Sequence, residues 1–150
     1  MLGALLPSNR RQIEIAVDLI RRPGKNRIGV LGLSFKAGTD DLRESPLVVL
    51  IETLIGKGHK LTIYDEEVSL AALLGANKKY IDRVIPHISS LLVGSIGEVV
   101  SASDVIVVGK KSPAFAEALI GLPDEKTVID LVRLSPARTA HQGGYEGIAW

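Results

Sequence analysis

The sequence predicts an α/β domain in which helices cover both faces of a mainly parallel sheet. Short apolar runs alternate with segments of helical length, which is the pattern of a doubly wound fold. The runs are almost continuously hydrophobic, as expected for parallel strands that are buried on both sides. The chain has 150 residues, 46% of them hydrophobic, which is enough for one domain with a substantial core. Together these observations favour a Rossmann-like architecture preceded by an N-terminal linker helix.

The linker helix is expected close to the N-terminus. Its apolar positions recur at helical spacing and are Ile13, Val17 and Ile20. Ser8 suits the N-cap and Pro23-Gly24 ends the pattern, so the sequence predicts a helix over residues 9–21. A short polar stretch follows, and we therefore expect this helix to pack outside the main core or to join the domain to something else. We divide the chain into a linker region, 1–24, and an α/β domain, 25–150.

The later elements follow from apolar runs and from the proline, serine and glycine residues at helix ends. The expected strands cover residues 27–31, 61–64, 104–108 and 127–131, and the tail over 147–150 could add an edge strand. The expected helices cover 46–56, 96–101 and 113–120, with a loosely patterned helical region over 68–92. Right-handed crossovers bring the carboxyl ends of the strands to one rim, so the loops 32–44, 65–68 and 109–113 should hold any ligand.

Charge and cysteine content argue against several classes of function. The net charge is +1, which gives no support for nucleic acid or an anionic membrane as a partner. No apolar stretch is long enough to span a bilayer, and the N-terminus lacks the basic leading region of a signal peptide. The chain has no cysteine, which excludes disulfides and a thiolate nucleophile within it and fits a cytoplasmic location. His59, His87 and His141 show no metal-ligand spacing.

The loop after the first strand combines glycines with basic and acidic side chains. Its glycines do not spell the G-x-G-x-x-G fingerprint, so this domain alone is not expected to hold a dinucleotide in the usual way. Lys36 could reach a phosphate or sugar oxygen, or could be an ordinary solvated lysine. Arg43 offers a planar fork for a phosphate or carboxylate, and an ion pair with Asp40, Asp41 or Glu44 is about equally favoured. These two aspartates could orient the cations or cap the following turn.

Three other places on the expected rim carry charged side chains. Asp65 ends the second strand and could bind a ribose hydroxyl, although the interpretation that it simply starts a turn is favoured. Lys110 and Lys111 follow the third strand, where a solvated pair is favoured over a pair that screens a bound diphosphate. Arg133 follows the fourth strand and is a weaker candidate for ligand contact.

The run over residues 32–46, Gly-Leu-Ser-Phe-Lys-Ala-Gly-Thr-Asp-Asp-Leu-Arg-Glu-Ser-Pro, closely resembles the C-terminal domain of the nucleotide-sugar 6-dehydrogenases. These are the UDP-glucose and GDP-mannose dehydrogenases. Segments that also fit the family are 61–65, 103–105 and 128–132, and those that resemble the GDP-mannose branch most are 75–81, 85–87, 89–92 and 146–150. The leading helix, with Ser-Asn-Arg-Arg-Gln over 8–12, resembles the end of the long helix that joins the family's two domains and makes its dimer.

The resemblance implies a role in the NAD-dependent oxidation of a sugar C6 alcohol to a carboxylate, through a cysteine-bound intermediate. It implies that Phe35 and Lys36 contact the nucleotide sugar and that Arg43 reaches NAD, which the missing N-terminal domain mainly binds. It also implies a homodimer formed through the N-terminal helix. The chain lacks that N-terminal domain and the nucleophilic cysteine, so the chain alone is predicted to be inactive.

Two questions stay open at the level of sequence. Hydrogen-bond logic does not separate a guanine from a uracil nucleotide. The alternative to an enzyme part is a free-standing nucleotide-sugar-binding or assembly module without catalysis. The UDP-glucose members often carry Asp-Gly-Arg after the fourth strand, whereas this chain has Asp-Leu-Val-Arg over 130–133, so a substrate role for Arg133 does not follow from the resemblance.

Overall fold

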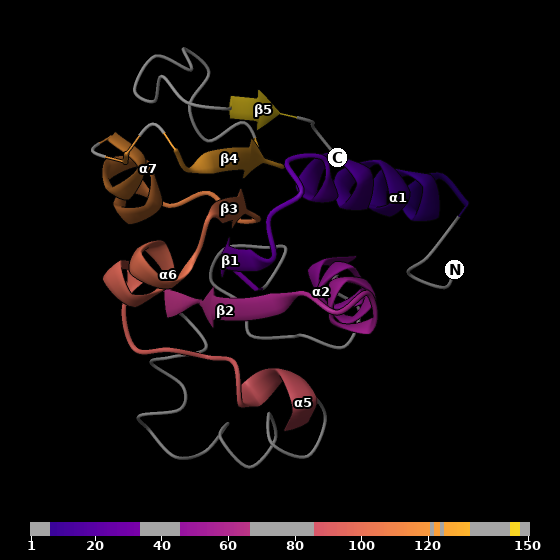
Figure 1. Cartoon of the computed structure of the whole chain (residues 1–150), viewed down its shortest axis with the longest axis horizontal. Helices are drawn as coiled ribbons and strands as arrows, with labels where there is room; N and C mark the ends of the chain where they lie inside the picture. Colours follow the sequence, from indigo (N-terminus) through magenta and orange to yellow (C-terminus); the bar gives the residue numbers. More distant parts are fainter. Residues whose placement is uncertain are drawn as a thin grey trace.

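Five parallel strands form a sheet in the order β2-β1-β3-β4-β5 (Figure 1). The strands are β1 (Arg27–Leu31), β2 (Lys60–Tyr64), β3 (Val105–Val108), β4 (Thr127–Asp130) and β5 (Tyr145–Gly147). They are seen in a computed structural model that describes residues 7–33, 46–66, 86–120, 122–123, 125–132 and 145–147. The parallel sheet confirms the predicted fold class.

The chain changes direction across the sheet between β1 and β3. It leaves β1 for β2 on one side, then returns to place β3 on the other side of β1 and continues outward to β4 and β5. Ile28 of β1 is therefore in register with Leu61 on one side and with Val105 on the other. The carboxyl ends of β1 and β3 flank the place where doubly wound sheets usually bind ligands.

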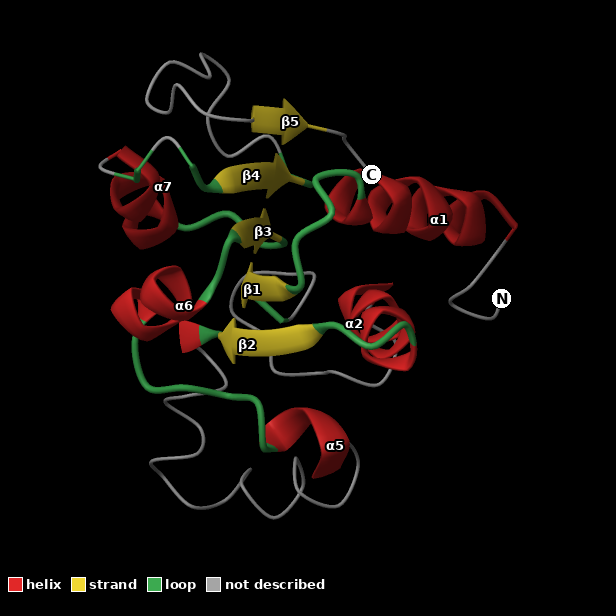
Figure 2. Cartoon of the chain, in the orientation of Figure 1, coloured by secondary structure: helices red, strands yellow, loops and turns green. Residues whose placement is uncertain are grey.

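Helices lie on both sides of the sheet (Figure 2). The helices are α1 (Pro7–Arg21), α2 (Pro46–Gly56), α5 (Pro86–Ser89), α6 (Ile96–Ala102) and α7 (Pro113–Ile120). The helices α1 and α2 share one hydrophobic core with the sheet, and α6 and α7 share another. Alternate residues of β3 serve the two cores, since Val105 and Val107 face α1 and α2 while Ile106 and Val108 face α6 and α7. Burial on both faces explains why the strands read as continuous apolar runs.

Helix α1 belongs to the first core. Its predicted apolar positions Ile13, Val17 and Ile20 are buried together with side chains of α2 and of the sheet. The expectation that this helix packs outside the main core is therefore wrong. The helix also begins two residues earlier than predicted. The periodicity identified the buried face correctly, but it could not show that the face rests on the domain's own sheet.

The predicted strands and most predicted helices are confirmed, with ends that differ by one or two residues. The expected edge strand exists, but it starts earlier, at Tyr145. Of the helical region expected over 68–92, residues 68–85 lie outside the described part of the chain. Residues 86–89 of this region are helical, as helix α5, and a turn follows. Leu92 then pairs with β2, where the N–H of Ile63 donates to the Leu91 carbonyl at 3.0 Å and the N–H of Val93 donates to the Ile63 carbonyl at 2.8 Å. This short pairing covers part of the open edge of β2.

Candidate functional site

The candidate site lies at the rim where the strands end. Three strands contribute the described residues that matter most there: Gly32 and Leu33 follow β1, Asp65 follows β2, and Lys110 follows β3. All four are buried. The oppositely charged side chains of Asp65 and Lys110 are both buried, which indicates an ordered polar cluster rather than a solvated loop.

The carboxylate of Asp65 joins two neighbouring strands. Its Oδ2 accepts a hydrogen bond from the backbone N–H of Leu33 at 2.7 Å, and the residue is only 1% exposed. The interpretation that Asp65 simply starts a turn is therefore incomplete. A buried carboxylate that accepts a backbone N–H makes a charge-assisted bond, which is stronger than one between neutral groups.

Lys110 is the residue whose place differs most from the expectation. It is 5% exposed, and its Nζ lies 3.5 Å from each carboxylate oxygen of Asp65. Only its neighbour Lys111 is exposed, so the favoured solvated pair is wrong for Lys110. One usable signal lies in the sequence, where Asp65 directly follows one apolar strand and Lys110 follows another after a single glycine. Parallel strands bring such positions to the same rim, although sequence alone does not say which strands are neighbours.

Gly32 makes room for this ion pair. A Cβ built on Gly32 would overlap the Cβ of Lys110 and lie 3.0 Å from its backbone nitrogen. The Lys110 side chain therefore passes over the end of β1, where there is no side chain, and reaches Asp65 at the end of β2. Gly32 also has a φ of +98°, and its N–H donates to the Tyr64 carbonyl at 2.8 Å. A backbone of this kind suits glycine alone.

Two other polar residues lie at the ends of strands. Asp130, at the end of β4, is buried, and its Oδ1 accepts the N–H of Val132 at 3.0 Å. Burial, then the negative charges of Glu66 and Asp65, raise the pKa of the Tyr64 hydroxyl. The Tyr64 ring meets the Phe115 ring edge-on, with centroids 6.3 Å apart. Tyr64 is therefore a neutral group at neutral pH.

The residues that the sequence favoured for ligand contact, Phe35, Lys36 and Arg43, lie outside the described part of the chain, as does Arg133. The structure instead defines both ends of the segment that carries the first three. Leu33 before it and Leu47 after it are fully buried, at the end of β1 and in the first turn of α2. The roles of Phe35, Lys36 and Arg43 stay predictions.

The remaining features lie in other parts of the molecule. His59 accepts a hydrogen bond from Arg21 at 3.2 Å, and His87 lies 2.8 Å from Glu52. Within the described ranges no cluster of acids, histidines or cysteines could hold a metal ion, and no helix could cross a membrane.

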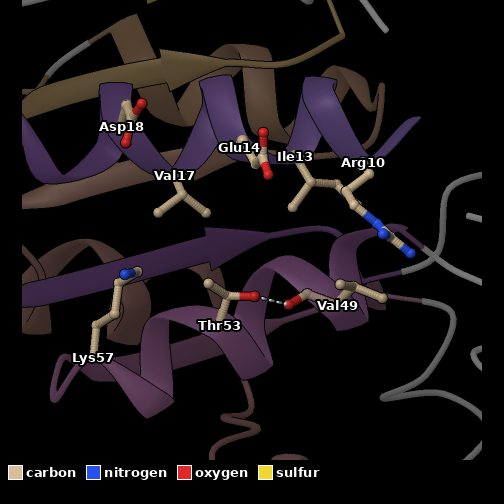
Figure 3. A pocket seen from close by; sticks show the side chains of 8 residues that line it. All are labelled: Arg10, Ile13, Glu14, Val17, Asp18, Val49, Thr53 and Lys57. Carbon is tan, nitrogen blue, oxygen red and sulfur yellow. Dashed lines mark hydrogen bonds between the residues drawn. The ribbon is translucent and has the colours of Figure 1, made fainter. Parts of the chain in front are cut away.

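A groove of about 340 Å³ lies between α1 and α2 (Figure 3). It is lined by Arg10, Ile13, Glu14, Val17, Asp18, Val49, Thr53 and Lys57.

Comparison with known proteins identifies the family. Residues 29–136 match the UDP-glucose/GDP-mannose dehydrogenase family, UDP binding domain. The chain belongs to this family. It is 51% identical over 150 residues to the GDP-mannose 6-dehydrogenase of Pseudomonas aeruginosa, covering 100% of this chain and 34% of that protein. It is 29% identical over 158 residues to the UDP-glucose 6-dehydrogenase of Rickettsia bellii, covering 97% of this chain and 33% of that protein.

Solved structures agree with the sequence relatives. A ternary complex of GDP-mannose dehydrogenase from Pseudomonas aeruginosa matches with a TM-score of 0.86 and 50% identity, over 97% of this chain and 33% of that one. A UDP-glucose dehydrogenase from Pyrobaculum islandicum matches with a TM-score of 0.68 and 28% identity, over 95% of this chain and 30% of that one. The chain thus spans about a third of the length of these relatives, and it corresponds to the C-terminal part of the first of them. These comparisons give no support to the alternative of a free-standing nucleotide-sugar-binding or assembly module without catalysis.

Proposed function

We propose that this chain is the nucleotide-sugar-binding part of an NAD-dependent GDP-mannose 6-dehydrogenase, which oxidises the sugar C6 alcohol to a carboxylate. The observation that supports it most is the 51% identity to GDP-mannose 6-dehydrogenase over the whole chain, against 29% to a UDP-glucose 6-dehydrogenase. The TM-scores of 0.86 and 0.68 differ in the same direction. Guanine is therefore the proposed base of the nucleotide-sugar substrate.

Lys36 and Phe35 are proposed to contact the nucleotide sugar. A lysine ammonium is a mobile point charge that suits a diphosphate. The segment that carries both residues starts at buried Leu33, beside the switch point of the sheet, where ligands of doubly wound folds bind. The position of Leu33 supports the assignment, and the resemblance to the family supplies the roles of the two side chains.

NAD is proposed to be bound mainly outside this chain, with Arg43 reaching it. The described rim does not suit a dinucleotide in the usual position, because buried Lys110 lies against Gly32 and occupies the space beside the end of β1. The loop after β1 also lacks the G-x-G-x-x-G fingerprint. The chain has no cysteine to form a covalent intermediate, so the chain alone is expected to produce no NADH.

A chimera tests this function. The C-terminal third of the Pseudomonas aeruginosa GDP-mannose 6-dehydrogenase is replaced by this chain, and NADH formation is followed with GDP-mannose and with UDP-glucose. We expect turnover that prefers GDP-mannose. Lys36→Ala should raise KM for the nucleotide sugar about tenfold or more, because a charge-assisted contact is lost. Arg43→Ala should raise KM for NAD instead.

Lys57→Ala is the matched control, since Lys57 is an exposed lysine beyond the far end of α2. It should leave both KM values unchanged. A folded chimera that turns over neither nucleotide sugar would contradict the proposed function. A chimera that prefers UDP-glucose would contradict the choice of base.

A homodimer formed through the N-terminal helix and a cytoplasmic location belong to the same proposal. Helix α1 presents Ile15, which is 41% exposed, together with the exposed charges of Arg11, Glu14 and Asp18. These are the kinds of side chain that a second helix could meet. Sedimentation velocity of the chain tests the dimer, and a species of one-chain mass at all concentrations would contradict it.

A further inference from the structure

We propose that Asp65 and Lys110 form a positioning pair that fixes the backbone at Leu33 and thereby the start of the nucleotide-sugar-binding segment. The inference rests on the function proposed above for Phe35 and Lys36. It adds two residues, from two other strands, to the machinery of that site. Neither residue is proposed to touch the substrate.

The geometry that supports the pair involves three adjacent strand ends. The carboxylate of Asp65 stands between two donors, the N–H of Leu33 at 2.7 Å and the ammonium of Lys110 at 3.5 Å. The Asp65 side chain is fully buried, and that of Lys110 is nearly so. One acidic group therefore links the segment after β1 to the residue after β3.

Burial makes each member depend on the others. A buried backbone N–H needs an acceptor, and a buried carboxylate needs a cation or several donors. Removal of Lys110 takes a cation away from a buried negative charge, and removal of Asp65 takes an acceptor from Leu33 and a counter-charge from Lys110. The backbone at Leu33 should shift in either case.

A shift of the backbone at Leu33 should affect the ligand because Lys36 is close to Leu33 in the chain. Lys36 follows Leu33 by three residues, a stretch that spans at most about 11 Å even when fully extended. The place of Leu33 thus limits where the Lys36 ammonium can be. A positioning role predicts that the pair affects ligand affinity through Lys36, whereas a purely structural role predicts an effect that is independent of Lys36.

Binding of GDP-mannose to the 150-residue chain, measured by calorimetry, separates these two roles. We expect Asp65→Ala to weaken binding about tenfold and to have less than about a threefold further effect when Lys36→Ala is already present. Equal losses in the two backgrounds would overturn the proposal. Asp130→Asn is the matched control, because Asp130 is also a buried rim carboxylate that accepts a backbone N–H. Its effect on affinity should be independent of Lys36.

Amide hydrogen exchange tests the anchoring itself, without a ligand. The Leu33 amide should lose protection about tenfold in Asp65→Ala, relative to the Ile106 amide in β3. Unchanged relative protection would overturn the proposal. If the unaltered chain binds no nucleotide sugar but Leu33 loses protection as expected, the proposed function fails in this chain while the anchoring is supported.

A rescue variant keeps the test informative if Asp65→Ala does not fold. Lys110→Met alone should lower Leu33 protection and ligand affinity, because the carboxylate stays buried without that cation. Combining it with Asp65→Asn removes both charges and keeps a carbonyl acceptor for Leu33. We expect the double variant to recover most of the protection and affinity. A double variant as impaired as Lys110→Met would overturn the proposal.

Discussion

Gly32 stands where three chain segments approach one another closely. Its φ of +98° is a left-handed conformation, and the Lys110 side chain occupies the space that a Cβ would need. Its N–H is bonded to the Tyr64 carbonyl, so the backbone cannot turn away without losing that bond. Two separate costs therefore oppose any side chain at this position, one conformational and one steric.

Gly32→Ala should lower the free energy of unfolding by about 2–5 kcal/mol, the sum of a positive-φ cost and an overpacking cost. Gly58→Ala is the control, because Gly58 has a φ of +90° but a Cβ added there would meet no atom within 4 Å. That substitution should cost only about 1–2 kcal/mol. Urea denaturation measures both variants. Equal losses would contradict the steric account of Gly32.

Arg27 and Asp104 form an ion pair at the opposite, amino end of the sheet. The Asp104 carboxylate accepts from Nε of Arg27 at 3.1 Å and from Nη2 at 2.9 Å. The Arg27 hydrogen bonds, more than its charge, hold the pKa of Asp104 below the ordinary value of 3.8. Both side chains are substantially exposed, so the contribution to stability is small and is screened by salt.

The lowered pKa of Asp104 fixes the sign of a pH effect. Between the native and the unfolded pKa the unfolded chain binds more protons, so stability rises with pH there. The pair stabilises fully above pH 3.8, and its contribution is lost as pH falls through the lower native pKa. We expect Asp104→Asn to flatten the acid limb of a stability–pH curve. An unaltered acid limb in Asp104→Asn would contradict the pairing.

The burial of Lys110 could not be predicted from the sequence. Lysines are seldom buried, so a solvated lysine was the reasonable expectation. The partner, Asp65, is 45 residues away in the chain. Their proximity depends on the order β2-β1-β3 and on the absence of a side chain at Gly32. Alternation of strands and helices predicts a common rim, but it does not fix which strands are neighbours.

At the scale of elements, the side chains of Ser95 and Glu98 cap the first turn of α6. Ser95 Oγ accepts the N–H of Glu98 at 3.3 Å, and the Glu98 carboxylate accepts the N–H of Gly94 at 3.1 Å. The helix has only seven residues, so its first turn is a large part of it. Its single fully buried side chain, Val99, packs into the core on the α6–α7 face. The cap therefore helps to set how this face is closed.

Ser95→Ala should lower the free energy of unfolding by about 0.5–2 kcal/mol, since the first-turn N–H of Glu98 loses its acceptor. Ser101→Ala is the control within the same helix, because Ser101 is exposed and its hydroxyl bonds to the Glu98 carbonyl one turn back. It should change stability little, as alanine is the better helix former. Thermal or chemical unfolding decides, and a neutral Ser95→Ala would contradict the importance of the cap.

Local signals found most of these elements, for physical reasons that are visible in the structure. The helices α2 and α7 begin at prolines, a residue preformed for the first helical turn, and both matched their predicted bounds. The pairing of residues 91–93 with β2 was missed, because it forms with backbone groups on the edge of a strand that is distant in the sequence. The sequence of residues 91–93 does not indicate that this strand edge lies beside them.

At the scale of the whole molecule, helix α1 packs as part of the domain's hydrophobic core. Its buried side chains share a core with α2 and four strands. A helix that only linked this domain to another part would leave an apolar face uncovered within the chain. Helix α1 and the α/β domain therefore share one core, and the division predicted after residue 24 stays a prediction.

Ile20→Ala should lower the free energy of unfolding by about 2–5 kcal/mol, the cost of a cavity in a closed core. Ile20 is fully buried, whereas Ile15 on the same helix is 41% exposed. Ile15→Ala should therefore cost well under about 1 kcal/mol. Urea unfolding of both variants measures the contrast. A small effect of Ile20→Ala would show that α1 contributes little to the stability of the domain.

The central place of β1 has a consequence for synthesis. β1 is the first of the described strands to be made, yet its two neighbours are β2 and β3, and β3 begins only at Val105. A nascent chain on the ribosome therefore keeps the N–H and C=O groups along one edge of β1 unpaired until the residues of β3 have emerged. During that interval the edge is open to strands of other chains. Strand order, more than final stability, sets how long the growing chain needs protection from aggregation.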